Sequence, residues 1–179
     1  MRIIRKVLNR GLLTFFNKEV LGDTFPWFYI NATTSNLKPF KNSYEHIQFF
    51  HTFIDSGKCN SPTWLSHLDI VFKEILKPFD IDKEKIERMK INYQPQYHPP
   101  KGKIHNNPHV DFDGDFKTVI FYLNTCDGAT YFFDKEKISK KIESEANTLI
   151  QFDGNLLHAG SHPQQFQQRL VLNINYKCE

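Results

Sequence analysis

The segment RLVLNINYK, residues 169–177, alternates between mainly polar and apolar residues along its whole length. Successive side chains of a β-strand point to opposite faces, so this segment predicts a strand with two different faces. The apolar face packs in a core, and the polar face lies either in solvent or inside a barrel that holds a ligand. The polar face carries Arg169, Val171, Asn173 and Asn175, and the apolar face carries Leu170, Leu172, Ile174 and Tyr176.

Four earlier segments have the same character and are separated by Gly, Pro, Asp or Asn, the residues typical of turns. They are ERMKINYQ (87–94), FKTVIFYLN (116–124), DGATYFF (127–133) and EANTLIQFDG (145–154). Several short strands in succession predict a sandwich or a barrel. The region 85–179 is therefore expected to be the mainly β part of the protein.

The region 1–84 differs in pattern and is expected to support the strands. Residues 61–79 have apolar side chains at helical spacing after Ser61 and Pro62, which suit the start of a helix. Residues 2–20 predict a second helix, which Gly11 weakens. Two aromatic segments between them, 25–30 and 43–55, predict strands. With 179 residues, the chain is expected to form a single domain, 1–179.

Composition argues against several classes of protein. The net charge of +3 is small and spread along the chain, so nucleic-acid binding is not indicated, although an anionic substrate fits. Three widely spaced cysteines predict no disulfide framework and favour a reducing compartment. No segment has the roughly 20 apolar residues of a membrane span. The basic start is interrupted at residues 9–11, so we interpret it as mature sequence and expect a soluble, cytoplasmic protein.

The segment NNPHVDFDG (106–114) places His109 and Asp111 two positions apart. Residues i and i+2 of a strand share a face, so both side chains reach one metal ion. His158, which lies in FDGNLLHAG 47 residues after Asp111, supplies a third ligand from a neighbouring segment. Two imidazoles and one carboxylate on one side of an ion are typical of non-haem iron(II) oxygenases.

Other histidines and acids fit this pattern less well. His105 and His109 have the spacing of helical zinc sites, but Pro108 opposes a helix. Asp113 is expected to be a solvated or turn-forming carboxylate, and His162 a surface histidine before a proline. The remaining histidines lack a ligand spacing, and His51 is the one of these with most interest.

Arg169 follows His158 by 11 residues, on the polar face of the last predicted strand. A buried guanidinium without a partner costs several kcal/mol, so an inward Arg169 requires an anion. Its fork of donors fits a carboxylate at two points. If Arg169 pointed outward, no ligand would be needed.

The run PHVDF, KTVIFYLN, DGATYFF, NTLIQFDGNLLHAG and RLVLNINY, about residues 90–176, resembles the 2-oxoglutarate and Fe(II)-dependent dioxygenases of the prolyl-4-hydroxylase type. The segments FPWFY and HTF also resemble small phage-encoded relatives, which would place the protein in a host cytoplasm. The resemblance implies a double-stranded β-helix, a cupin-like jelly roll. One departure is Asp127-Gly128, where many relatives have two glycines, and it is expected to alter only a turn.

The resemblance also implies site residues and cofactors. His109, Asp111 and His158 match the iron ligands, and Arg169 matches the residue that binds the distal carboxylate of 2-oxoglutarate. Other matches and inferences are Tyr122 as a further contact of that carboxylate, Tyr93 as a residue of the cosubstrate pocket, and Asn173 as a neighbour of the ligands. Fe(II), 2-oxoglutarate and dioxygen are the implied cofactor and cosubstrates, and no catalytic residue is needed beyond the metal ligands.

The implied activity is hydroxylation of an unactivated C–H bond with formation of succinate and carbon dioxide, on a prolyl residue of a peptide or on a small molecule. A nucleobase or a free amino acid is an alternative substrate, and a jelly-roll binding module without catalysis is an alternative function. Residues 94–108 contain four prolines and lead to His109, so they form either a substrate lid or an irregular connection. Trp27 and its aromatic neighbours line a substrate groove or pack in the core. The oligomeric state is left open.

Overall fold

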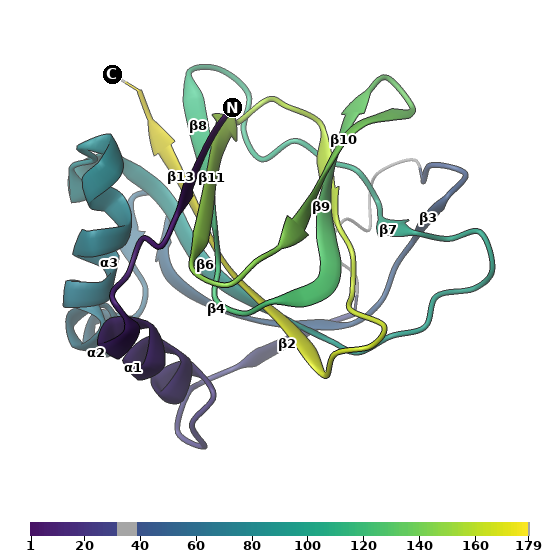
Figure 1. Ribbon diagram of the computed structural model, residues 1–179. Coiled ribbons are helices and arrows are strands. Elements are labelled where there is room, and N and C mark those ends of the chain that lie inside the picture. Colours follow the sequence, from purple (N-terminus) through teal and green to yellow (C-terminus); the bar gives the residue numbers. More distant parts are fainter. Residues whose placement is uncertain (32–38, 179) are drawn as a thin grey trace.

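The computed structural model describes residues 1–31 and 39–178. Its largest feature is an eight-stranded antiparallel sheet in the order β1-β11-β8-β13-β6-β4-β2, with β5 beside β4 (Figure 1). The strands are β1 (Arg2–Arg5), β2 (Phe28–Ile30), β4 (Gln48–Asp55), β5 (Lys58–Cys59), β6 (Ile86–Pro95), β8 (Phe116–Tyr122), β11 (Thr148–Asp153) and β13 (Gln168–Lys177). Strands of the first 84 residues thus extend the sheet at both edges.

A smaller sheet lies opposite the large one (Figure 1). It has three antiparallel strands in the order β10-β9-β12, and a short parallel pair, β3-β7, lies beside it. These strands are β3 (Ser43–Tyr44), β7 (His105–Asn106), β9 (Cys126–Asp134), β10 (Lys137–Ser144) and β12 (His158–Gly160). The two sheets form a jelly roll, as the sequence predicts.

All five predicted strands of the second half are present, as β6, β8, β9, β11 and β13. The sequence did not predict β10, KISKKIES, which pairs only with β9 at the edge of its sheet and is almost wholly exposed. Lysines on an edge strand oppose pairing with another chain, and they remove the apolar alternation by which a strand is recognised.

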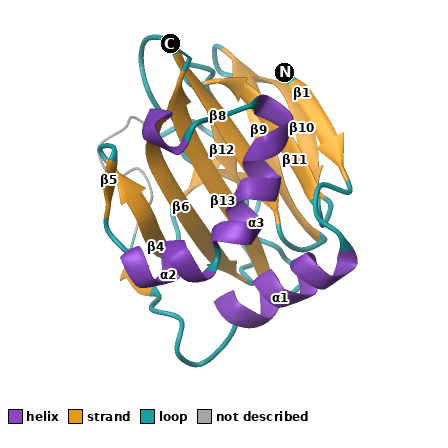
Figure 2. Ribbon diagram, turned by 90° about the vertical axis from the view of Figure 1, so that its left-hand side faces the viewer, coloured by secondary structure: helices purple, strands orange, loops and turns teal. Residues whose placement is uncertain are grey.

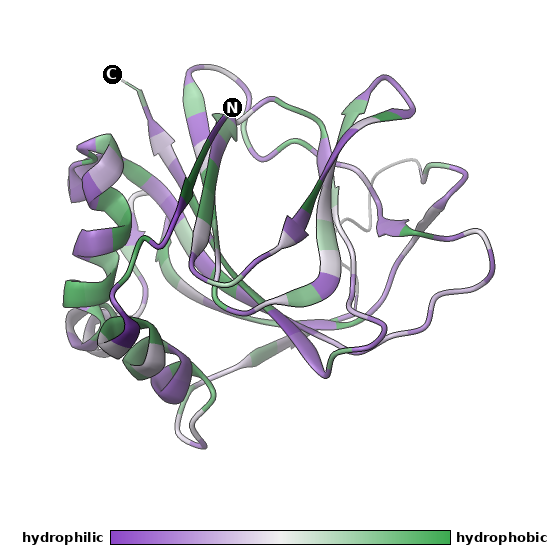
Figure 3. Ribbon diagram, in the orientation of Figure 1, coloured by the Kyte–Doolittle hydropathy of each residue, from purple (hydrophilic) through white to green (hydrophobic). Residues whose placement is uncertain are grey.

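Three helices cover one face of the large sheet (Figure 2). They are α1 (Arg10–Val20), α2 (Pro62–His67) and α3 (Asp69–Leu76), and two 3₁₀ turns follow, η1 (Lys77–Phe79) and η2 (Lys83–Lys85). Hydrophilic and hydrophobic residues both occur along α1 and α3, as amphipathic helices require (Figure 3).

The two helix predictions need correction at their ends. Residues 2–5 form strand β1 instead of the first turn of a helix, because they pair with β11. Helix α1 starts after Asn9, whose side chain accepts a hydrogen bond from the backbone N–H of Leu12 at 2.9 Å. The predicted helix 61–79 is divided at Leu68, which is fully buried.

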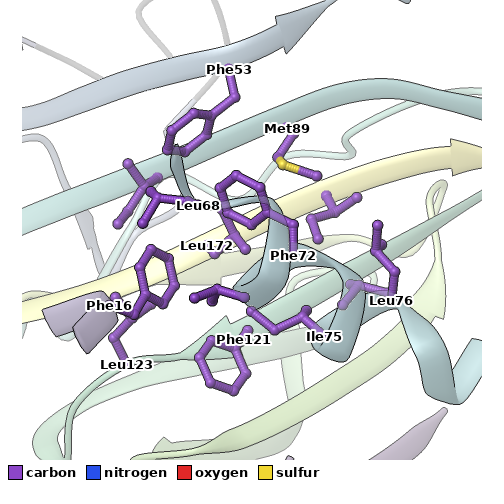
Figure 4. Close-up of a cluster of buried hydrophobic side chains, with 14 of the residues drawn as sticks. Phe16, Phe53, Leu68, Phe72, Ile75, Leu76, Met89, Phe121, Leu123 and Leu172 are labelled. Atoms are coloured by element: carbon purple, nitrogen blue, oxygen red, sulfur yellow. The ribbon is translucent and has the colours of Figure 1, made fainter. Parts of the chain in front are cut away.

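The main core lies between the helices and the large sheet (Figure 4). Phe72 of α3 meets Phe16 of α1 edge to face, with ring centroids 6.0 Å apart, and meets Phe53 of β4 at 4.9 Å. On the sheet side, β6 contributes Met89 and Ile91, which are 1% and 0% exposed. The apolar faces of β6 and β13 are therefore used by this core, and their polar faces point into the jelly roll.

The prediction that His162 is a surface histidine is wrong, since this residue is 2% exposed. Its ring contacts the backbone carbonyl of Ile47 through Nε2 at 3.0 Å and the hydroxyl of Tyr44 through Nδ1 at 3.3 Å. In the neutral ring, Nε2 donates to the carbonyl and Nδ1 accepts from the hydroxyl. Burial lowers the pKa of His162 to about 4.

The position of His162 predicts a loss of stability in acid. Below its ordinary pKa of 6.5 the unfolded chain binds a proton that the folded protein excludes, so the free energy of unfolding falls as the pH drops from 6.5 to about 4. One histidine contributes up to about 1.4 kcal/mol per pH unit in that window. Urea unfolding of the wild type and of His162→Gln at pH 7, 6, 5 and 4.5 measures it. We expect a shallower pH dependence for the variant, and equal slopes would contradict this assignment.

Candidate metal centre

His109 and His158 are brought together by the backbone. The N–H of each donates to the carbonyl of the other, both at 2.9 Å, in an isolated antiparallel bridge. Two residues paired in this way present their side chains on the same face. The two imidazole rings accordingly lie with their centroids 4.6 Å apart.

Asp111 is held beside the two rings by its own backbone contact. Its N–H donates to the carbonyl of Gly154 at 3.0 Å, in the turn that precedes His158. Its Oδ1 lies 3.9 Å from Nε2 of His109, and its Oδ2 lies 3.7 Å from Nε2 of His158. Within the described residues, these three form the one group of at least three His, Cys, Asp or Glu side chains placed to bind a single ion.

The side chain of Asp111 is 2% exposed, and its carboxylate accepts several hydrogen bonds from residues of the large sheet. Arg88 donates to Oδ1 at 2.7 Å, while Thr118 and Asn175 donate to Oδ2 at 2.9 and 3.0 Å. Asn173 approaches Oδ2 at 3.4 Å. The donors come from β6, β8 and β13, so three strands fix the orientation of one ligand.

The protonation states in the centre suit a cation. Burial by itself raises the pKa of Asp111, but the neighbouring His158 and Arg88 outweigh it and hold this pKa well below its usual range. Burial, together with His158, lowers the pKa of His109 to about 4. Nδ1 of His158 lies 2.9 Å from the carbonyl of Leu156, a contact that places its proton on Nδ1 and leaves Nε2 free to bind metal.

The donor set fits a metal ion. All three ligand atoms lie within 4.8 Å of one another, and an ion about 2 Å from each would draw them closer together. His109 is 28% exposed at its side chain, which opens the centre to the pocket beside it. Two imidazoles and one carboxylate on one side would leave the other side of the ion open for exogenous ligands.

The other candidate ligands lie elsewhere. His51 contacts the carbonyl of Pro26 and Oγ of Ser61, both at 2.9 Å, so it connects β4 to the start of α2. His105 contacts the carbonyl of Asn106 through Nδ1. Asp113 is exposed beside the Gly114 turn, as predicted.

Arg169 points inward, where it is 3% exposed. It donates from Nε to Ser144 at 2.7 Å, from Nη1 to Gln94 at 2.6 Å and from Nη2 to Thr130 at 2.9 Å. These acceptors are neutral, and no described carboxylate forms an ion pair with this guanidinium. A buried charge without a counter-ion is an anion-binding group.

The ring of Tyr122 packs against the guanidinium group of Arg169. Its ring centroid lies 5.6 Å from the guanidinium carbon, a cation–π contact. Its hydroxyl donates to Oγ1 of Thr130 at 2.8 Å, and burial raises its pKa, so it stays a neutral donor. Thr130 thus accepts from both Tyr122 and Arg169, and its own proton is left to donate to a pocket ligand.

The structure corrects the placement of Tyr93. Side chains of β6 alternate, and Tyr93 lies on the helix side of the sheet, where its ring contacts Trp27 at 5.6 Å and Phe49 at 5.8 Å. It therefore does not line the pocket, and Trp27 belongs to the same aromatic cluster. Asn173 does line the pocket, next to Asp111.

The Asp127-Gly128 pair also needs correction, because it lies inside β9 instead of in a turn. A Cβ atom at Gly128 would lie 2.7 Å from Cδ of Arg169 and 2.8 Å from the carbonyl oxygen of Ser161. Gly128 therefore makes room for the buried guanidinium. Asp127 accepts hydrogen bonds from the backbone N–H groups of Gln164 and Gln165.

A single pocket joins the metal centre to Arg169. Its volume is about 320 Å³, and Ile120 and Val171 form an apolar part of its wall. Sequence reasoning missed its polar residues on β6, namely Arg88, Lys90, Asn92 and Gln94. The signal was present, since these four alternate with Met89, Ile91 and Tyr93 in the same way as the two faces of β13.

The contacts of Asp111 predict that Thr118→Val weakens metal binding. Valine keeps the shape of threonine but removes the hydroxyl that donates to Asp111 and accepts from Asn175. Loss of such a supporting contact typically reduces metal affinity 10–100-fold. Anaerobic titration with Fe(II), or with Mn(II), measures the affinity. Thr14→Val, on the exposed face of α1, is the matched control, and an unchanged affinity in Thr118→Val would contradict the role of this contact.

Gly128→Ala is expected to weaken the binding of a dicarboxylate by at least about tenfold, or about 1.4 kcal/mol. The added methyl group meets backbone at Ser161, which does not yield easily, so the guanidinium of Arg169 must move. Calorimetric titration of the metal-loaded protein with 2-oxoglutarate measures the change. Gly11→Ala in α1 is the control, and a Gly128→Ala protein with wild-type affinity would mean that this site does not use the observed position of Arg169.

No family model and no curated protein matches the chain. Solved structures do match, over almost its whole length. An oxidoreductase of the 2OG-Fe(II) oxygenase family from Burkholderia pseudomallei has a TM-score of 0.65 at 13% identity, with 98% of this chain and 84% of that chain covered. A prolyl-4-hydroxylase from Pseudomonas putida has a TM-score of 0.53 at 15% identity, with 99% and 92% covered.

A third match is a prolyl hydroxylase from Trichoplax adhaerens in complex with a peptide of hypoxia inducible factor. Its TM-score is 0.56 at 18% identity, with 98% of this chain and 82% of that chain covered. At these identities the matches show the fold. The chain therefore has the jelly-roll fold found in 2OG-Fe(II) oxygenases, prolyl hydroxylases among them.

Proposed function

We propose that the protein is an Fe(II)- and 2-oxoglutarate-dependent oxygenase that hydroxylates an unactivated C–H bond. One observation carries the proposal: a His-Asp-His ligand set and a buried guanidinium without a counter-ion face the same pocket. The ligand set favours iron with open positions. The guanidinium favours a carboxylate placed at a distance from the metal.

The residues present fit both groups. His109, Asp111 and His158 hold the metal, and Arg169 receives the distal carboxylate of 2-oxoglutarate with the hydroxyl of Thr130 as a further donor. The apolar side chains of Ile120 and Val171 line the pocket and suit the two methylene groups of the diacid. When bound, iron and 2-oxoglutarate supply the oxidation of substrate by dioxygen, with succinate and carbon dioxide as products.

The chain itself sets geometry. Gln94, Ser144 and Thr130 fix the plane of the guanidinium, so the cosubstrate meets a preformed site. The four donors around Asp111 orient this carboxylate, and His158 and Arg88 keep it ionised. None of these roles requires a side chain to act as a general acid or base.

The fold does not determine the substrate. The likeness to two prolyl hydroxylases, one with a bound peptide, favours a prolyl group as the reacting position. Within the described residues, no helix has the length and apolar content to cross a membrane. A phage origin and a cytoplasmic location stay predictions.

Anaerobic titration tests the proposed function. Fe(II) followed by 2-oxoglutarate should give the absorption band of a metal-bound keto acid, and oxygen should then give succinate. His158→Ala is expected to lose the band and to reduce succinate formation more than about 100-fold, because it removes a metal ligand. His67→Ala, an exposed histidine of α2, is the control. A wild-type protein that gives neither band nor succinate would leave the binding-module alternative.

A further inference from the structure

We propose that Lys90 and three asparagines form a second binding end in the pocket, which holds the carboxylate and the N–H donors of an α-amino acid. The inference rests on the proposed function and names the substrate class for it. An amino acid enters either free or as the C-terminal residue of a peptide. An internal prolyl residue, which has no free carboxylate, does not meet these requirements.

Lys90 is a cation of the pocket that has no carboxylate partner. Lys90 lies on β6, opposite Asn173 of β13. Asn173 in turn contacts Asp111, so Lys90 is separated from this candidate ligand by one strand position. No described carboxylate forms an ion pair with its ammonium group. Nζ lies over the ring of Phe50, 5.6 Å from the centroid. Burial lowers its pKa to about 8, so it is still mainly protonated at neutral pH.

The neighbouring cation, Arg88, is already neutralised. It donates to Asp111 through Nη2 and to Asn175 through Nε, at 2.7 and 3.0 Å. Among the described residues, Lys90 is therefore the cation near the candidate metal ligands that has no ion-pair partner. A partly desolvated ammonium group is stabilised by an anion at hydrogen-bonding distance.

This position differs from the site of Arg169. Arg169 is opposite Gln94 on β6, four residues beyond Lys90, which corresponds to about 13 Å along a strand. The two cations therefore start from well separated positions on the sheet. The pocket therefore has a cation at each end, with the metal ligands near the Lys90 end.

Three asparagines with unpartnered side-chain amide groups indicate that the ligand also donates hydrogen bonds. Oδ1 of Asn92, Oδ1 of Asn173 and both polar side-chain atoms of Asn106 are buried without a hydrogen-bond partner, and all three residues line this pocket. Asn106 is 3% exposed and Asn173 is 8% exposed. Buried polar groups without partners cost about 1–3 kcal/mol each, so a ligand that donates hydrogen bonds is stabilised here.

Together, these groups select the ligand. The ammonium of Lys90 pairs with one negative charge, and the amide oxygens accept from N–H groups. An α-amino acid has both within a few ångströms of each other. A phosphate dianion would bring a second negative charge next to the amide oxygens, while Arg88 is already paired with Asp111 and Arg169 lies opposite a residue about 13 Å away along the strand.

Paramagnetic line broadening tests this inference without turnover. The protein is loaded with Mn(II) under argon and saturated with 2-oxoglutarate, and NMR records which probe molecules broaden near the metal. The probes are the twenty L-amino acids, the matching amino acid amides, and tripeptides with free or amidated C-termini. We expect at least one free acid or free-C-terminal tripeptide to broaden, and its amide to broaden at least about tenfold less.

Lys90→Met keeps the length of the side chain and removes its charge. We expect it to abolish probe broadening while the affinity for 2-oxoglutarate changes less than twofold, and Lys73→Met on α3 to behave as wild type. Thermal unfolding of each variant confirms folding.

The outcomes separate the two proposals. If 2-oxoglutarate itself is not broadened in the wild type, the proposed function fails. If 2-oxoglutarate broadens but no carboxylate probe does, or if amides broaden equally, the amino acid inference is overturned. It is also overturned if Lys90→Met loses affinity for 2-oxoglutarate in parallel, since Lys90 would then serve the cosubstrate.

Discussion

The site depends on one antiparallel backbone pair, the two hydrogen bonds that join His109 to His158. Two residues paired in this way must present their side chains on the same face, so the pair determines that both imidazoles meet. Asp111 follows two residues later and is tied to the turn before His158 by its contact with Gly154. The candidate metal centre is thus a consequence of strand pairing between two residues 49 positions apart in the chain.

Charge organises the rest of the interior. The apolar faces of β6 and β13 pack against the helices, which obliges their polar faces to line the jelly roll. That arrangement buries Arg169 among neutral acceptors and surrounds Asp111 with donors. A pocket in which Arg169 and Lys90 form no ion pair with a described carboxylate is suited to hold small anions beside the candidate metal ligands.

The arrangement also explains why single residues matter outside the ligand set. The sequence suggests for Gly128 only a place in a turn. In the structure, a side chain at this position would collide with Arg169. Thr130 likewise looks like an ordinary strand residue, and only the structure shows that it accepts from both Tyr122 and Arg169. These contacts join β8, β9 and β13, which no pattern within one segment reveals.

The sequence by itself predicted the five strands of residues 85–179, a sandwich or barrel, and the grouping of His109 with Asp111, because alternation and i, i+2 spacing are local properties of a strand. It left open whether Arg169 points inward or into solvent, which the tertiary structure decided. It misplaced Tyr93 and His162 and missed β10, since each depends on which neighbour covers a face or an edge. Only the tertiary structure decided that Lys90 and the asparagines share a pocket with the metal ligands. The reason is that strand order and register, which place residues from distant segments side by side, are set by the packing of the whole chain.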